Sequence, residues 1–190
     1  MELQEILTGI CLGIALSACC GFRIFVPLLL ASLAARFGFV PLSSGFEWMN
    51  TWAAVTCFGV ASVLEVAAYY IPVVDNLLDT LTTPGSVIAG TIISASMFID
   101  LDPMTKWALA LIAGGGTAGI IQSGTGLLRL GSTKLTAGLG NSVVASLENI
   151  FSIIGTLLSL LIPVAMFVLF ITLVAGTIYL LARRFVSKMG

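Results

Sequence analysis

The chain has 190 residues, of which 58% are hydrophobic and only 9% are charged, and its formal net charge is -1. A soluble domain carries about 25% charged residues, so this composition is that of an integral membrane protein. The balanced charge supplies no basic surface for nucleic acid. We therefore expect a lipid bilayer around the protein and no nucleic-acid partner.

The first third of the chain predicts two short membrane helices around one arginine. The start, "MELQEILTGI", lacks the positive region of a cleavable signal peptide, so we expect its apolar run to be retained. The runs Ile6–Phe22 and Ile24–Ala35 are separated only by Arg23. A helix needs about 20 apolar residues to cross a bilayer, so both runs are short.

The rest of the chain predicts further membrane segments. Their apolar runs are Thr51–Ile71, Gly85–Ile99, Trp107–Leu128, Ser142–Ile162 and Pro163–Ala182. Between them, "RFGFVPLSSGFEWMN" is the most loop-like stretch. We expect Trp48, Trp52 and Trp107, beside polar residues at the ends of runs, to lie in the headgroup region.

Prolines and glycines predict interruptions in these helices. Pro27, Pro72, Pro84 and Pro163 are each expected to disrupt or start a helix. The stretch "AGGGTAG", Ala113–Gly119, permits either close packing of helices or unwinding around a substrate. It lacks the Lys and Ser/Thr ending of a phosphate-binding loop.

No cofactor is expected. Cys11, Cys19, Cys20 and Cys57 lie in apolar runs without the spacing of a disulfide framework, and the chain has no histidine. A zinc site at the first three cysteines would need four well-placed ligands, and no imidazole is available. We interpret the four cysteines as reduced packing residues and expect no metal.

The sequence contains an ordered recurrence. "GIALSACCGFR", ending at Arg23, matches "GIIQSGTGLLR", ending at Arg129, and "VASVLE", ending at Glu65, resembles "VVASLE", ending at Glu148. Such short matches also arise by chance in apolar sequence. We predict an all-α polytopic membrane protein with a single domain, 1–190, built from two related repeats at about 5–99 and 106–184. Inverted topology, common in transporters with broken helices, is the expected arrangement.

Four ionisable residues fall inside apolar sequence. A charge at a helix centre costs about 2.5 to 3.5 kcal/mol, so Arg23, Glu65, Arg129 and Glu148 are expected to face partners or water, with the arginines as charge partners of the glutamates. Two interpretations remain open. The pairs line a polar pathway, or they are structural salt bridges that hold the helices together.

A second set of polar residues surrounds Pro72. In "VVDNLLDTL", Asp75 and Asp79 stand four apart and share a face of a helix, and Asn76 adjoins the first. With Glu65 they form a candidate cation or proton site. The alternative is an amphipathic helix at the membrane surface. The second repeat offers Asn141, Glu148 and Asn149, which complete the cluster only if the two halves converge.

Several of these residues also resemble a family pattern. "EVAAYYIPVVDNLLDTLTTP" and "NSVVASLEN" resemble the bacterial integral-membrane family known as domain of unknown function 4126, and the likeness extends over most of the chain. The resemblance implies a membrane-embedded fold and no particular activity. Many members have an Asp-Lys pair where this chain has Tyr69 and Tyr70, and a second acidic residue where it has Asn149.

These observations predict a small transporter or channel for an ion or small polar solute. The alternative is a membrane scaffold or assembly protein whose charges are purely structural. An intramembrane enzyme with Asp75 and Asp79 as its acids is disfavoured, because the chain has no histidine and no recognisable nucleophile motif. We expect no catalytic residues.

The expected surroundings follow from the tail and the chain length. Arg183, Arg184 and Lys188 follow the last run and predict a cytoplasmic C-terminus, here of a multi-pass protein of the bacterial inner membrane. A chain of this length leaves little thickness around a pathway, so a homo-oligomer, most simply a dimer, is expected.

Overall fold

The computed structural model describes residues 3–136 and 140–189, with side chains described outside 72–80 and 180–189. Within these ranges the protein consists of helices and turns, without a strand. The elements in chain order are α1 (Leu3–Cys20), α2 (Phe25–Arg36), the 3-10 helix η1 (Glu47–Asn50), α3 (Trp52–Ala68), α4 (Pro72–Met97), α5 (Pro103–Leu109), the π-helical segment η2 (Ala110–Gly115), α6 (Gly116–Thr136), α7 (Asn141–Leu161) and α8 (Pro163–Met189).

The helices have the length and composition of membrane segments. In the described residues, Leu3–Cys20, Pro103–Thr136 and Asn141–Leu161 are long and apolar enough to cross a bilayer. The apolar helices Phe25–Arg36 and Trp52–Ala68 are shorter. Many large apolar side chains of α3, α6, α7 and α8 face outward, as lipid-exposed side chains do. The prediction of an all-helical membrane protein is confirmed at this level.

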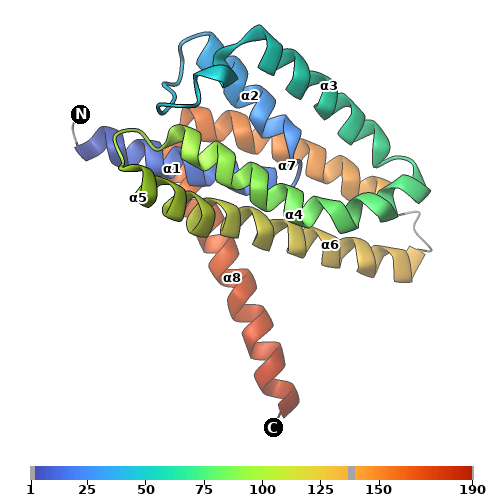
Figure 1. Ribbon diagram of the computed structural model, residues 1–190. Coiled ribbons are helices and arrows are strands. Elements are labelled where there is room, and N and C mark those ends of the chain that lie inside the picture. Colours follow the sequence, from blue (N-terminus) through green and yellow to red (C-terminus); the bar gives the residue numbers. More distant parts are fainter. Residues whose placement is uncertain (1–2, 137–139, 190) are drawn as a thin grey trace.

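Helix α4 packs against α1 and against the continuous helix formed by α5, η2 and α6, and α1 also contacts η2 and α6 directly (Figure 1). Glycines allow these backbones to approach closely: a Cβ atom at Gly114 would lie 2.1 Å from the Ser94 hydroxyl. Buried hydroxyls then link the helices, since Ser17 donates to the Gly114 carbonyl at 2.5 Å and Ser94 donates to the Gly13 carbonyl at 3.0 Å. The contacts between these helices therefore involve small and hydroxylated residues.

Helix directions bear on the predicted repeat. Helix α4 runs antiparallel to both α1 and α6, so the two arginine-bearing segments run in the same direction, whereas the glutamate-bearing helices α3 and α7 run in opposite directions (Figure 1). An inverted duplication would reverse the arginine helices relative to each other. The arrangement therefore gives no support to inverted repeats.

The four prolines, each predicted to disrupt or start a helix, behave differently: Pro27 lies in the first turn of α2, two others begin helices, and one lies inside a helix. Pro72 and Pro163 are the first residues of α4 and α8, where the missing N–H costs nothing. Pro84, in contrast, lies inside α4, a helix of 26 residues, so the prediction is wrong at this position. Proline removes one N–H from the i→i−4 hydrogen bonds, and helices of membrane proteins tolerate this where surrounding groups or small local adjustments satisfy the freed carbonyl. The glycine-rich stretch Ala113–Gly119 also stays helical, since it begins in the π-helical segment η2 and continues into α6.

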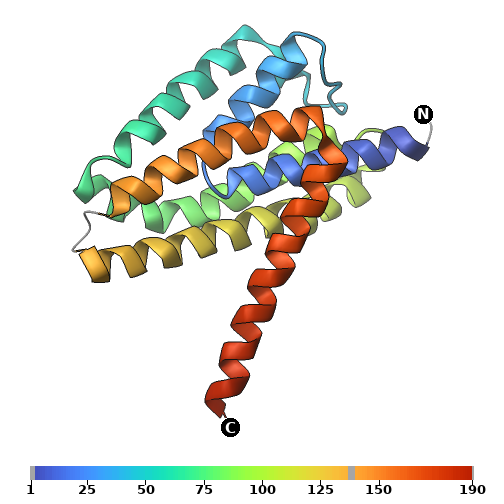
Figure 2. The same cartoon turned by 180° about the vertical axis from the view of Figure 1, so that it is seen from behind.

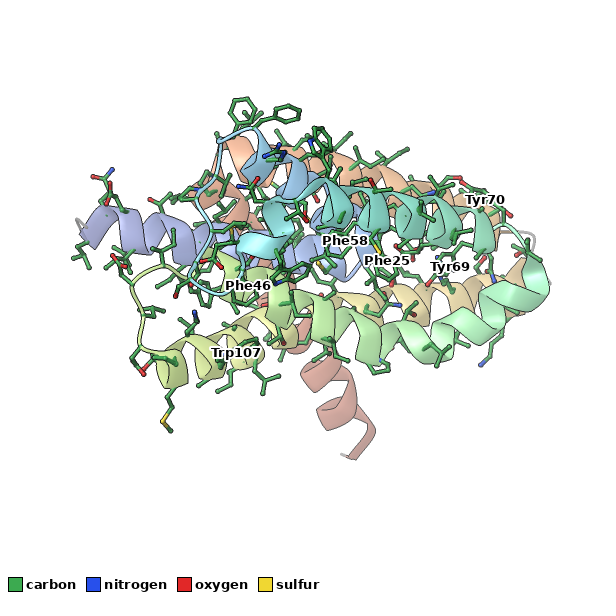
Figure 3. All side chains as sticks on the ribbon, turned by 45° about the horizontal axis from the view of Figure 1, so that its top comes forward. Phe25, Phe46, Phe58, Tyr69, Tyr70 and Trp107 are labelled. Carbon is green, nitrogen blue, oxygen red and sulfur yellow. The ribbon has the colours of Figure 1, made fainter. Side chains whose placement is uncertain are left out.

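One end of the bundle holds the expected loop and the three tryptophans. The loop after α2 is fixed by Lys106, which is buried and donates to the Ser43 hydroxyl at 3.0 Å and to the Ser44 carbonyl at 3.2 Å. Phe46 and Trp107 lie at this end, and Tyr69 and Tyr70 lie toward the other (Figure 3). Helix α8 packs on α1 through Met166 and Phe170, and its C-terminal part extends away from the other helices (Figure 2).

Candidate functional site

The site begins at the break between α1 and α2. Helix α1 ends at Cys20, and Gly21 comes so close to α6 that a Cβ atom there would lie 2.7 Å from the Ala118 carbonyl oxygen. The chain then turns through Arg23, which is only 1% exposed, before α2 begins at Phe25. The turn therefore places a buried guanidinium group among α1, α2 and α7.

Glu148 of α7 holds both buried arginines. Its Oε2 atom lies 3.1 Å from Nη1 of Arg23, and it also accepts from Nη2 of Arg129 on α6. Nε of Arg129 donates to the other carboxylate oxygen at 3.1 Å, so the Arg129 fork binds the carboxylate through two nitrogens. All three side chains are nearly inaccessible to solvent. The predicted pairing of arginine with glutamate is present at Glu148.

Arg23 has three further acceptors. Its Nε donates to Oδ1 of Asn149, its Nη2 donates to the Ala145 carbonyl at 3.0 Å, and its Nη1 donates to the Phe22 carbonyl at 3.5 Å. Four acceptors around one planar group fix its position and orientation. Arg23 therefore stays in place without depending on Glu148 alone.

Tyr69, directly after α3, joins the two arginines. The guanidinium carbon of Arg23 lies 3.9 Å from the centre of the Tyr69 ring, and that of Arg129 lies 4.1 Å from it. Tyr69 is 3% exposed, so these cation–π contacts form away from water, where they are strongest. The Tyr69 hydroxyl also shares a hydrogen bond with Thr82, which accepts from Gln122 at 2.9 Å.

Glu65 has a different partner from the one expected. In the described part of the chain it forms no ion pair; instead, its two carboxylate oxygens accept from the backbone N–H groups of Ile24, at 2.7 Å, and Phe25, at 3.0 Å. A carboxylate at this position satisfies the unpaired amides at the start of α2 and opposes the helix dipole. The expectation that Glu65 pairs with an arginine is wrong, because the amides at the helix break take its oxygens.

A chain of polar contacts leads from this cluster to the surface. Nδ2 of Asn149 lies 3.4 Å from the hydroxyl of Tyr70, which is 47% exposed and lies 3.0 Å from the Ser146 hydroxyl. Asn149 therefore contacts the exposed Tyr70 on one side and the buried Arg23 on the other. We call Arg23, Tyr69, Arg129, Glu148 and Asn149 the charged cluster.

The comparisons with known proteins place the chain in a family. A family model described as a domain of unknown function, DUF4126, matches residues 10–183. The chain belongs to the DUF4126 family. Comparisons with curated proteins and with solved structures gave no significant match. The resemblance seen in the sequence of this DUF4126 protein is thus confirmed. The description of the family names no activity.

Other predicted site residues lie apart from the charged cluster or outside the described side chains. Asn141 is the first residue of α7, and its Nδ2 lies 3.0 Å from the Thr133 hydroxyl on α6. Asp75, Asn76 and Asp79 belong to α4, as the expected helix, but their side chains lie outside the described residues. Their predicted role as a cation site stays a prediction.

The acidic residues and cysteines of this DUF4126 protein are its candidate metal ligands, since the chain has no histidine. In the described part of the chain, no group of three Cys, Asp or Glu side chains is arranged to hold an ion. The cysteines differ in their surroundings: Cys19 and Cys20 are buried, as packing residues are, whereas Cys57 is exposed.

Glu148 lies nearer to the middle of α7 than to either of its ends. Glu148 comes seven residues after the start of α7 and thirteen before its end, about 10 and 20 Å along the helix axis. Sequence reasoning missed Tyr69 as a member of the cluster. The available signal was its departure, together with Tyr70, from the charged pair of many DUF4126 members.

Proposed function

We propose that this protein is a small integral-membrane transporter or channel for an ion or small polar solute, with a pathway through the charged cluster. The observation that carries the proposal is the meeting of Arg23, Arg129 and Glu148, from three separate elements, beside the turn between α1 and α2 inside an apolar protein. Charges in such positions are costly, and they mark substrate and ion pathways in membrane proteins. Broken helices build the binding sites of many transporters.

The polar contacts around the cluster support this proposal. The exposed Tyr70 contacts Asn149, Asn149 contacts Arg23, and Arg23 contacts Glu148. On the other side, Tyr69 leads through Thr82 to the buried Gln122. A solute that crosses the protein needs such successive polar partners, because the surrounding side chains are apolar.

A second candidate function is a membrane scaffold, and the saturation of Arg23 favours it. Arg23 has four protein acceptors, and both carboxylate oxygens of Glu65 accept hydrogen bonds from backbone amides at the start of α2. Such contacts hold helices together whether or not anything moves through the protein, and a buried ion pair is not by itself evidence of function.

Flux measurements on purified protein in liposomes separate the two candidates. Wild-type protein should carry at least one ion or small polar solute faster than empty liposomes, and Glu148→Gln should change that flux at least tenfold. Glu47→Gln is the matched control, because Glu47 is exposed and its carboxylate accepts from the nearby amide of Gly45, away from the charged cluster. If wild-type flux equals that of empty liposomes for inorganic ions, carboxylates and small sugars alike, the scaffold is the better assignment.

The remaining expectations belong to the same proposal. We place the protein in the inner membrane of a bacterium with the C-terminus of α8 in the cytoplasm, and we propose a dimer. The inverted repeat stays a sequence prediction on which the pathway does not depend. Accessibility labelling of a cysteine added at the C-terminus, and crosslinking in the membrane, measure the orientation and the oligomeric state.

A further inference from the structure

We infer that the substrate class is a small carboxylate anion, and that the Glu148 side chain occupies the place of this anion on Arg23 and Arg129. This inference rests on the proposed transport function and deepens it. It is carried by the way in which one carboxylate is held by two guanidinium groups.

The first step is the geometry around Glu148. Arg129 binds one carboxylate oxygen through Nε, at 3.1 Å, and the other through Nη2, and Arg23 adds Nη1 at 3.1 Å. A two-nitrogen fork facing two oxygens is the arrangement with which arginine recognises planar carboxylates. A free carboxylate in this position would find the same three donors.

The second step is the independence of Arg23 from Glu148. Arg23 is held by Asn149, by two backbone carbonyls and by the face of Tyr69, and these contacts do not involve Glu148. When Glu148 swings away, the guanidinium group therefore keeps its position and is already oriented for a ligand. At the same moment it loses its one carboxylate partner among the described residues, so an anion from outside is favoured there.

The third step concerns access. Asn149 is partly exposed and joins Arg23 to the hydroxyl of Tyr70 at the surface. Ser146, one helical turn before Asn149, adds a hydroxyl at the same place. A small anion that enters past Tyr70 therefore meets an amide and hydroxyl groups before it reaches Arg23.

The size of the ligand follows from the Glu148 side chain. Truncation to alanine removes a CH2 group and the carboxylate, which together have the shape of one acetate ion. Acetate is therefore the probe that restores the missing atoms, and acetamide is the neutral control of the same shape. Chloride tests whether charge alone is sufficient, because it lacks the two oxygens that the Arg129 fork binds.

The experiment has a binding arm and a flux arm on the full-length protein. In the binding arm, the shift of the thermal unfolding midpoint is titrated with acetate, acetamide and chloride for wild-type protein, Glu148→Ala and Glu47→Ala. We expect acetate to bind Glu148→Ala at least tenfold more tightly than wild-type protein, since the attached competitor is gone. Glu47→Ala should match wild-type protein. If Glu148→Ala does not fold, Glu148→Gln serves as the second variant, with the same expected direction.

In the flux arm, the uptake of labelled pyruvate into liposomes is measured. Pyruvate is chosen because it is almost entirely ionised at neutral pH, so little of it crosses the bilayer unaided as the free acid. Wild-type protein should carry pyruvate with saturation, and Arg23→Lys should reduce this flux at least tenfold while Arg36→Lys, at an exposed site, leaves it unchanged. Equal responses of Glu148→Ala to acetate and acetamide would overturn the inference.

Two further outcomes would also overturn it. If acetate binds Glu148→Ala but wild-type protein carries no pyruvate, Glu148 is a structural counter-ion. If wild-type protein carries cations and not pyruvate, the substrate class is wrong while the transport function stands. The absence of any flux contradicts the transport function itself, so the failures are distinguishable.

Discussion

Replacing Tyr69 tests how strongly its ring holds the two buried arginines. Tyr69→Leu removes the aromatic face from Arg23 and Arg129, whose guanidinium carbons lie 3.9 and 4.1 Å from the ring centre. A desolvated cation–π contact contributes about 2 kcal/mol, so the two contacts together contribute about 4 kcal/mol. Tyr69→Phe keeps the ring and loses only the hydrogen bond to Thr82, about 1 kcal/mol.

The assay is thermal unfolding of the purified protein in detergent. For a chain of this length, 1 kcal/mol shifts the unfolding midpoint by about 2–4 °C, so we expect a loss of roughly 8–16 °C for Tyr69→Leu and about 2–4 °C for Tyr69→Phe. Tyr179→Leu is the matched control, because Tyr179 is 65% exposed on α8. Equal losses for Phe and Leu, or a Leu variant as stable as wild-type protein, would refute this reasoning.

Three further predictions concern single elements. Glu65→Gln should weaken the cap of α2 by about 1 kcal/mol and speed hydrogen exchange at Phe25, and unchanged exchange there would contradict the cap. Gly114→Ala should destabilise by about 1–3 kcal/mol because its Cβ would meet Ser94, whereas Gly124→Ala, with open space around it, should not; equal stability of both variants would contradict the close packing. Hydrogen bonds from the Thr105 hydroxyl and amide lower the pKa of Asp102, so its cap of α5 stabilises above the ordinary carboxyl range and is lost in acid. Asp102→Asn should remove this pH dependence of exchange in α5, and its persistence would contradict the cap.

The sequence was sufficient for the class of fold and for the identity of the buried charges. Apolar runs around Arg23 predicted α1 and α2, because a permanent charge between two short runs needs a break and a buried partner. The partners of these charges were predicted correctly for one glutamate and wrongly for the other. Both Arg23 and Arg129 pair with Glu148, while Glu65 binds amides that become available only where α1 and α2 separate.

Other features could not be predicted from the sequence, because they depend on the direction and packing of whole helices. Pro84 was expected to break its segment, yet α4 continues through it, and membrane helices tolerate an internal proline where tertiary packing permits. Tyr69 gave no signal of periodicity, since it lies in the turn after α3, and its position between two arginines arises only when the turn between α1 and α2 comes close to α6. The parallel course of α1 and α6 is likewise a tertiary property.

The coupling between Arg23 and Glu148 tests most directly whether these charges are buried together. A double-mutant cycle with Arg23→Gln, Glu148→Gln and the double variant, measured by unfolding free energy, isolates the interaction from the separate effects of each change. The account predicts that the double variant is more stable than the sum of the single losses implies, by at least about 1.5 kcal/mol, as for close buried charge pairs. Additive losses, within about 0.5 kcal/mol, would show that the two side chains do not meet and would contradict the charged cluster.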